Sequence, residues 1–594
     1  MKRLPVTLRR LASVVGSLLV MAGLALTSDA ADNNNKKPPA TTDSKKPAGD
    51  EKKPAYPSHP DAKNVKIVPD AWRSAPHKPL TPAEVDELLA RELKSDKLTP
   101  SPLTTDEQFI RRATLDLTGK LPLPADVEEF VADKEPAKRS KLIDRLLASD
   151  EYPRHWARYW RDVLVARATS ERVKRTGLAL RFEDWMMGEL KANRSWGDIA
   201  HEIIQANGEL RFDNTDAKNG DLFFMFSHEG ADAANERAAE VSRIFMGIQI
   251  QCAQCHDHPS DIWKRNQFHE LAAFFARTRE RPIRDQQRLV GFALFSTPRG
   301  EHEMPDKDDP KKTTTIHPKF LTGETINHGL EDLERRKALA KFVTSKDNYW
   351  FSAAYVNRIW GDLMGQGFYQ PVDNMGPLQE ATYPNLLVRL AASFKATNYD
   401  EKALFRLIMN SQAYQRQIRL GDQSNDHLHF AGSYPTRLRA DALWDSLVGA
   451  LGPLQPERPG MGMGGAGGKG PMPGPFMRRF GLEGIFQATF GFDPSTKSDE
   501  VEGSVPQALM LMNNPAINNR MRAGGNTVLE KILTSYPEND EAIKMLYLRV
   551  LARKPTANEA ETCRKYIAEV GKRNEAFEDI LWTLTNSAEF QTKR

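Results

Sequence analysis

Residues 241–256 read Val241-Ser242-Arg243-Ile244-Phe245-Met246-Gly247-Ile248-Gln249-Ile250-Gln251-Cys252-Ala253-Gln254-Cys255-His256. The apolar side chains Val241, Phe245 and Ile248 recur at the spacing of one face of an α-helix. The same spacing occurs elsewhere in the chain, at Phe268, Leu271 and Phe275, at Leu339, Phe342 and Val343, at Leu404, Leu407 and Ile408, at Ile543, Leu546, Tyr547 and Val550, and at Phe577, Ile580, Leu581 and Leu584. This repeated pattern predicts a mainly α-helical fold.

Helix-start signals agree with this pattern. The stretch Thr81-Pro82-Ala83-Glu84 combines an N-cap residue, a proline at the first helical position and a capping glutamate. The capping-box spacing returns at Thr104 with Glu107 and at Thr556 with Glu559. The period-two alternation of strands is scarce, and residues 288–297 are the one short strand that we predict. We therefore expect a mainly α protein with two helical domains and minor β structure, joined by a loop rich in proline and charge.

The composition is that of a soluble globular protein. The chain has 594 residues, of which 40% are hydrophobic and 27% charged, and its net charge is only +4. This length is enough for more than one domain. No dense basic stripe with interleaved aromatic residues occurs, so the sequence predicts no nucleic-acid partner. Signatures of serine hydrolases, phosphate-binding loops and zinc proteases are also missing from the sequence.

The N-terminus carries the pattern of an export signal. Lys2, Arg3, Arg9 and Arg10 precede an apolar run over residues 11–26, and Ser28-Asp29-Ala30 follows as a cleavage site. An uncleaved membrane anchor is the alternative, but the run is shorter than a comfortable membrane span. We therefore predict a signal peptide over residues 1–30 and an exported protein, periplasmic or extracellular. After cleavage we expect no integral membrane domain.

Changes in composition suggest the domain boundaries. Residues 31–70 are rich in Lys, Pro and Asp, which predicts a disordered linker. A first helical domain should span residues 71–297. A connector that contains several prolines should follow it, over residues 298–325. A second helical domain should span residues 326–594. Residues 453–476 form a Gly/Pro/Met segment inside it, which we predict to be a flexible insertion.

The strongest chemical signal is Cys252-Ala253-Gln254-Cys255-His256. The chain has only 3 cysteines, and this spacing is typical of covalent c-type haem attachment. In this interpretation Cys252 and Cys255 form the thioether links and His256 is the proximal iron ligand. Covalent attachment takes place outside the cytoplasmic membrane, so the predicted export signal agrees with it. Cys563 is left over and is interpreted as a buried structural thiol.

Two other interpretations of the motif stay open. Cys252, Cys255, His256 and His258 offer the ligand types of zinc or another transition metal. Adjacent Cys255 and His256 point in different directions, however, which makes one tetrahedral site awkward. A redox dithiol or a structural disulfide is the third interpretation, and the βαβ context of a redox dithiol is missing. Haem is therefore favoured over a metal, and a metal over a dithiol.

Several segments together resemble a known pair of families. The stretches at residues 109–119, 248–259 and 356–360, with Pro371-Val372-Asp373, look like planctomycete-type exported proteins. These proteins pair the domains of unknown function numbered 1549, described as cytochrome-like, and 1553. The resemblance covers roughly residues 75–594. It implies export and a cytochrome-like role, and it supplies no substrate. The Gly/Pro/Met segment looks like an insertion relative to this pattern.

The sequence thus predicts an exported, cytochrome-like protein with one haem c, used in electron transfer or redox chemistry on an extracytoplasmic substrate. An unknown redox partner and a cell-surface or polysaccharide substrate are the expected partners. The rival hypothesis is a non-catalytic binding or scaffold protein whose cysteines hold zinc or each other. The candidates for apolar cover of a haem are Phe245, Trp263, Phe268 and Phe274. The candidates for its sixth ligand are His269, His228, Met225 and Met246, and the sequence favours none of them.

Other polar residues favour a structural interpretation. Arg111, Arg112 and Asp116 are predicted to form ion pairs between helices. Asn357, Arg358, Trp360 and Asp373 either line a cleft in the second domain or form a buried polar network, and the network is favoured.

Overall fold

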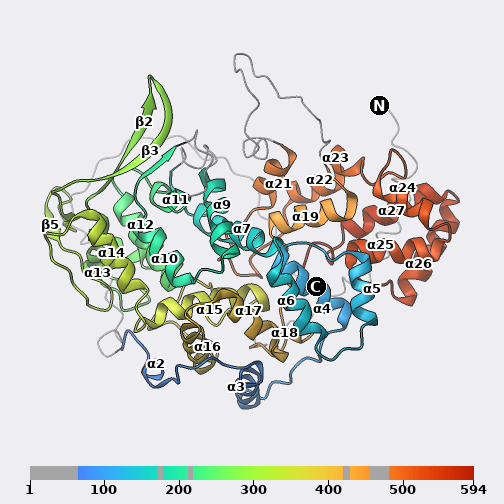
Figure 1. The fold of residues 1–594 in the computed structure, drawn as a ribbon, viewed down its shortest axis with the longest axis horizontal. Coiled ribbons are helices and arrows are strands. Elements are labelled where there is room, and N and C mark those ends of the chain that lie inside the picture. The colour runs from blue at the N-terminus through green and yellow to red at the C-terminus, as the bar shows by residue number, and fades with distance from the viewer. Residues whose placement is uncertain (1–64, 171–177, 212–218, 419–428, 455–480, 594) are drawn as a thin grey trace, which may run out of the picture. The chain divides into compact units, whose positions relative to one another are not determined.

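The structure is a computed structural model, and it describes residues 65–170, 178–211, 219–418, 429–454 and 481–593. The described residues are mainly helical with few strands, as the sequence predicts (Figure 1). The predicted signal peptide, nearly all of the linker and nearly all of the 453–476 insertion lie outside the described residues. Among the described helices, we find none with the length and apolarity that a membrane crossing requires.

Helices precede and follow the cysteine motif. Those that precede it or directly follow it are α2 (Asp70–Ser74), α3 (Pro82–Ser95), α4 (Asp106–Thr118), α5 (Pro124–Ala132), α6 (Lys138–Ala148), α7 (Glu151–Val165), α9 (Leu178–Lys191), α10 (Trp196–Gln205), α11 (Leu222–Phe226), α12 (Ala233–Met246) and α13 (Arg265–Ala272). The later ones are α14 (Asp332–Val343), α15 (Tyr349–Met364), α16 (Pro384–Ala396), α17 (Glu401–Met409), α18 (Gln412–Gln415), α19 (Ala440–Leu451), α21 (Leu482–Phe490), α22 (Val505–Asn513), α23 (Pro515–Asn518), α24 (Val528–Ser535), α25 (Asn539–Leu551), α26 (Ala557–Val570) and α27 (Arg573–Thr585). The 3-10 helices are η3 (Gln251–Gln254) and η4 (Ala273–Phe275).

Side-chain caps fix where several helices begin. The capping box of Thr81 and Glu84 opens α3, and that of Thr556 and Glu559 opens α26, as predicted. The prediction at Thr104 and Glu107 is wrong by one residue, because Thr105 caps α4 with Gln108. The hydroxyl of Thr104 instead donates to the Gln108 side chain, which ties the preceding residue to the same cap.

The β structure is small and antiparallel. The predicted strand at 288–297 is β3 (Arg288–Ser296), the centre of a three-stranded sheet with β1 (Glu209–Arg211) and β2 (Thr278–Asp285). A second pair, β4 (His302–Pro305) and β5 (Thr313–Ile316), forms a hairpin within the predicted connector. Sequence reasoning missed this hairpin, because the prolines and charges of the segment are typical of a loop.

The buried apolar residues form two clusters. The larger is built mostly from residues between Trp72 and Ala431, with Leu548 and Ala552, and includes helices from both sides of the connector. The smaller one is built mostly from residues 438–590. Phe245 of α12 and Tyr355 of α15 both pack on Trp196 in the larger cluster, with ring centroids 5.7 and 4.9 Å away. The helix that leads into the motif therefore shares its core with the second region. The domain boundaries themselves stay a prediction.

Residues 65–70, placed in the linker by composition, contact the folded body. Val65, Ile67 and Val68 pack against the larger cluster, and the indole N–H of Trp350 donates to the Ile67 carbonyl over 2.9 Å. Val65, Ile67 and Val68 explain the difference, because they give this short stretch apolar surface to bury that the preceding Lys/Pro-rich residues lack.

Candidate functional site

The cysteine motif lies on a tight turn after α12. The helical spacing of Val241, Phe245 and Ile248 predicts a helix through Ile248, but α12 ends at Met246 and Gly247 takes a left-handed conformation with φ of +68°. Glycine adopts this conformation without the strain of a Cβ atom. The chain then re-enters a helical path in η3, where Ala253 is buried and its N–H donates to the Ile250 carbonyl. Burial of the Ala253 side chain thus fixes the turn against the protein core.

Cys252 and Cys255 are both exposed and free. In a 3-10 turn, residues three positions apart lie on the same side, because the helix has three residues per turn. Cys252 belongs to η3 and Cys255 directly follows it with helical dihedral angles, so this rule places the two cysteines on one side. The chemistry and exposure of this donor set fit the attachment of a c-type haem.

The imidazole of His256 is oriented by the backbone. Its Nδ1 lies 2.7 Å from the carbonyl oxygen of Asp257, and because a carbonyl only accepts, Nδ1 is the donor. In the neutral ring the lone pair is then on Nε2, which is the arrangement that metal-ligating histidines commonly show. His256 thus meets the chemical requirement for an iron ligand.

His258 is in a different environment from the two cysteines. It is buried, its Nε2 donates to the Gln249 carbonyl over 3.2 Å, and its Nδ1 accepts from the Ser260 N–H over 3.3 Å. Burial lowers the pKa of His258, so the ring is neutral at pH 7. Both ring nitrogens are occupied by these bonds. Across the described parts of the chain, no group of three or more His, Cys, Asp or Glu side chains is arranged to hold a metal ion, and the four-residue set with His258 does not assemble.

Two histidines support the turn from the other side. His269 of α13 donates from Nε2 to the Gln254 carbonyl over 3.0 Å, so its Nδ1 is the acceptor. That nitrogen lies 2.7 Å from Nε2 of His302 on β4, which is therefore the donor. Burial lowers the pKa of His302 to about 4 and also lowers that of His269. This neutral pair connects the motif turn to the hairpin that the sequence did not predict.

The second region binds the motif loop through its backbone. The Met375 N–H donates to the Gly247 carbonyl over 2.7 Å, and the Gln379 side chain donates to the Ser260 carbonyl over 2.8 Å. Between these bonds, the Asp261 carboxylate accepts from the Leu378 N–H. Segments more than a hundred residues apart in sequence therefore hold the loop in place.

Asp373 is the centre of this attachment. Its side chain is 0% exposed and accepts from Gln249, from Arg243 over 3.1 Å and from Arg167 over 3.3 Å. Arg243 is itself paired with Glu240. Arg243, Arg358 and Arg167 hold the pKa of Asp373 below its usual value, although burial alone would raise it. The buried-network interpretation of Asp373 agrees with these contacts.

The residues considered for haem cover or a sixth ligand all lie inside the protein. Phe245, Trp263, Phe268 and Phe274 are core residues, and Met225 and Met246 are buried with them. His228 is buried beside Thr169 and Glu236, and His269 is engaged with His302. None of these side chains lies on the exposed surface with Cys252 and Cys255.

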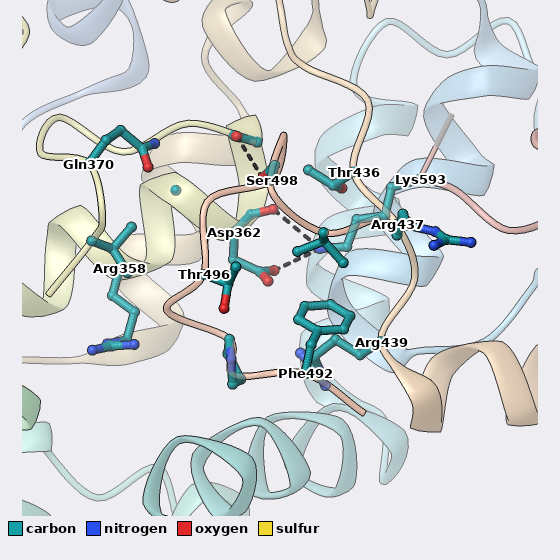
Figure 2. Close-up of a pocket in the computed structure, with 15 residues that line it drawn as sticks. Arg358, Asp362, Gln370, Thr436, Arg437, Arg439, Phe492, Thr496, Ser498 and Lys593 are labelled. Atoms are coloured by element: carbon teal, nitrogen blue, oxygen red, sulfur yellow. Dashed lines mark hydrogen bonds and ion pairs between the residues drawn. The ribbon is translucent and has the colours of Figure 1, made fainter. Parts of the chain in front are cut away.

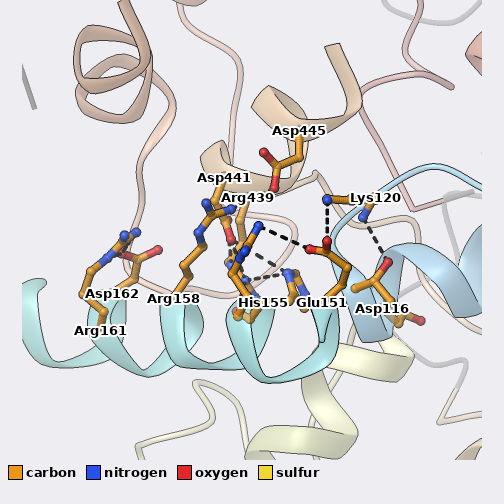
Figure 3. A network of polar contacts seen from close by, with 12 residues as sticks. Asp116, Lys120, Glu151, His155, Arg158, Arg161, Asp162, Arg439, Asp441 and Asp445 are labelled. Carbon is orange, nitrogen blue, oxygen red and sulfur yellow. Dashed lines mark hydrogen bonds and ion pairs between the residues drawn. The ribbon is translucent and has the colours of Figure 1, made fainter. Parts of the chain in front are cut away.

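A cleft that the sequence did not reveal lies between α7, α9 and α21. Its volume is about 570 Å³, within the range of small-molecule sites, and its lining includes Arg158, Arg161, Asp162, Glu183 and Asp493. Figure 3 shows Arg158, Arg161 and His155 along α7, next to Asp441 and Asp445 of α19. Arg158 donates to Asp445 over 2.8 Å, and Arg161 donates to Glu183. Each of these arginines has a carboxylate partner, so the first role of this network is to hold α7, α9 and α19 together.

A smaller cavity of about 50 Å³ lies beside α15 and the chain's last residues. Figure 2 shows the Lys593 amino group directed at Asp362, and Arg358 and Arg439 also line this cavity. Lys593 also pairs with Asp116 over 3.0 Å. The cavity holds a few water molecules at most. The dispersed sequence positions of these residues explain why no motif signalled them.

Comparison with known families places two matches on this chain. Residues 84–280, which include the cysteine motif, match the family model PSCyt2, described as a protein of unknown function (DUF1549). Residues 335–467, which include Asp373 and the segment that holds the motif loop, match the model PSD1, described as a protein of unknown function (DUF1553). No curated protein and no solved structure matches the chain.

Proposed function

This chain belongs to the proteins that pair a DUF1549 region with a DUF1553 region, and we propose that it is an exported, cytochrome-like electron-transfer protein with one covalent haem. Cys252 and Cys255 form the thioether links, and His256 is the proximal ligand. The observation that carries the proposal is the pair of exposed thiols on one 3-10 turn, directly followed by His256. The export pattern at residues 1–30 supports it, because attachment requires an extracytoplasmic location.

The surroundings of the turn support a redox role. A haem attached there supplies a one-electron couple when it is bound. The chain's own contribution is to hold the two thiols and the imidazole fixed, through buried Ala253, the bond from His269 to Gln254, and the bond from His256 to Asp257. Rigid support of this kind keeps donor atoms in place without reorganisation. Exposure of the cysteines leaves the site accessible to a redox partner.

The partner and the substrate follow as part of the proposal. We propose a soluble or surface-bound redox partner that reaches the exposed turn, and an extracytoplasmic substrate such as a cell-surface polysaccharide. The cleft of about 570 Å³ between α7, α9 and α21 is the place for a small substrate. Arg167 pairs with Asp493, which lines the cleft, and with the buried Asp373, which in turn accepts a hydrogen bond from Gln249 shortly before the turn.

The proposal is tested by producing the full chain together with haem-maturation machinery. Denaturing electrophoresis followed by a haem stain should reveal colour that stays with the polypeptide, and the visible spectrum should be of the c type. Cys252→Ala and Cys255→Ala should each reduce or abolish the stain. Cys563→Ala is the matched control, because this thiol is buried in α26 far from the motif in sequence, and the variant should keep the stain.

The rival function has its own outcome in the same experiment. A colourless wild-type protein containing one equivalent of zinc, or a Cys252–Cys255 disulfide, would support the non-catalytic scaffold and overturn the haem proposal. Metal analysis and thiol titration of the same sample distinguish the two rival states.

A further inference from the structure

A cavity of about 240 Å³ lies between α4, the end of α25 and the segment that follows α18. Its volume is below the range of about 300–1,000 Å³ typical of drug-sized ligands, so it fits a small group. The charged residues of its lining are Arg111, Arg112, Arg416, Arg553, Glu107 and Glu589. Arginine thus predominates in its lining, and the cavity is distinct from the cysteine turn and from the cleft beside α7.

Four arginines and two glutamates line this cavity, and three of the arginines are engaged with other groups. Arg553 is neutralised by Glu559 and Glu589, with N–O distances of 2.8 and 2.7 Å. The guanidinium of Arg111 donates to main-chain carbonyls such as that of Glu589. Arg112 likewise donates to the Tyr414 and Leu363 carbonyls.

The acidic partner predicted for these arginines is shared. Asp116 is 3.8 Å from Arg112 on the same helix, and it lies closer, at 3.0 Å, to Lys593. It also accepts from the Tyr414 hydroxyl. Lys593 also pairs with Asp362 over 2.8 Å, so Asp116 and Asp362 together serve Arg112 and Lys593, which leaves Arg416 among the arginines of the lining.

Arg416 is the decisive residue. Its side chain lines the cavity and is only 7% exposed, and its Nε and Nη1 atoms are buried with no hydrogen-bond partner among the residues that the structure describes. Burial lowers its pKa, although Asp86 acts in the opposite direction. A buried charged donor without an acceptor costs free energy, which an anion of suitable size would offset.

We infer that this cavity binds a small oxyanion, a carboxylate, phosphate or sulfate group, through the guanidinium of Arg416. Nε and Nη1 each form one edge of the guanidinium with Nη2, and such an edge can donate two parallel N–H bonds to an oxyanion, which lysine cannot do. Arg111 and Arg112 supply further positive potential on the adjoining helix. The site goes beyond the proposed electron-transfer role, since it needs neither the cysteines nor a haem.

The inference is tested by calorimetric titration of the full chain with sodium phosphate, sodium sulfate and sodium acetate, at constant ionic strength adjusted with chloride. At least one of the three should bind saturably, and the ranking identifies the oxyanion class. Arg416→Gln should weaken that binding by about tenfold or more, because a hydrogen bond to a charged group is lost. Arg549→Gln is the matched control, since Arg549 donates to the Ala450 carbonyl away from this cavity and should not affect binding.

Arg416→Lys keeps the positive charge but removes the planar guanidinium, so this variant should also bind the anion more weakly than wild type. It replaces Arg416→Gln in the test if that variant does not fold. Absence of saturable binding of all three anions to the wild-type protein would overturn the inference. Wild-type affinity in both Arg416 variants would overturn it as well.

Discussion

The side-chain amide of Gln249 donates a 2.7 Å hydrogen bond to Oδ1 of Asp373, which lies 124 residues further along the chain. Gln249 lies shortly before Cys252, and Asp373 also accepts from Arg243 of α12. The approach to the cysteine motif is therefore bound to the DUF1553 region through one buried carboxylate. The two regions cooperate in positioning the motif, and the following variants test this.

Asp373→Asn should destabilise the protein strongly. The substitution removes a charge that compensates buried Arg243 and partly exposed Arg167, and breaking a buried pair in this way costs about 3–5 kcal/mol. The free energy of unfolding from urea denaturation measures the effect. Asp150→Asn is the control, because its pair with Lys191 is on the surface, with side chains 79% and 68% exposed. A loss for Asp373→Asn no larger than that of the control would contradict the role of this network.

Gly376→Ala should loosen the motif loop. A Cβ atom at this position would overlap the Asp261 carboxylate, which is buried and bonded to the Leu378 N–H. We expect a stability loss of about 1–3 kcal/mol and faster proteolysis near the motif. Gly449→Ala is the matched control, because its Cβ would meet nothing within 4 Å inside α19, and it should stabilise the helix by about 0.5–1 kcal/mol. Equal behaviour of the two variants would show that Gly376 is not a contact point of the loop.

The pair of His269 and His302 should make stability depend on pH. Burial holds the pKa of His302 at about 4, whereas histidine in the unfolded chain has a pKa of about 6.5. Between these values the unfolded chain binds a proton that the folded protein does not. Stability should therefore fall as the pH is lowered through this window, by at most about 1.4 kcal/mol per pH unit for this group.

Urea denaturation at several pH values between 4 and 6.5 measures this slope. The glutamine side chain of His302→Gln does not titrate in this range, so the variant should give a shallower dependence than wild type. If His302→Gln retained the full slope, the neutral histidine pair would not be its source.

Local features of this protein could be predicted from the sequence, and distant contacts could not. The helical stripes, the caps at Thr81 and Thr556, and β3 follow from short-range spacing. The end of α12 at Gly247 and the hairpin that carries His302 were missed, because local composition resembles a helix in the first case and a loop in the second.

The candidate site shows the same division. The motif itself identifies Cys252, Cys255 and His256. It does not tell which neighbouring histidines use their ring nitrogens for hydrogen bonds within the fold. His258 bonds to Gln249, and His269 supports Gln254, only because tertiary packing brings these groups together. Arg416 lay outside every motif, since an unpaired buried guanidinium is a property of the fold and not of spacing.

The most direct test of the central claim is mass spectrometry of the tryptic peptide 244–264, which contains Cys252 and Cys255 and no internal Lys or Arg. The peptide should be isolated from the wild-type protein matured in an exporting host. The account predicts that it carries the mass of one haem, linked through both cysteines. A peptide with two unmodified thiols, or with a disulfide between them, would contradict it.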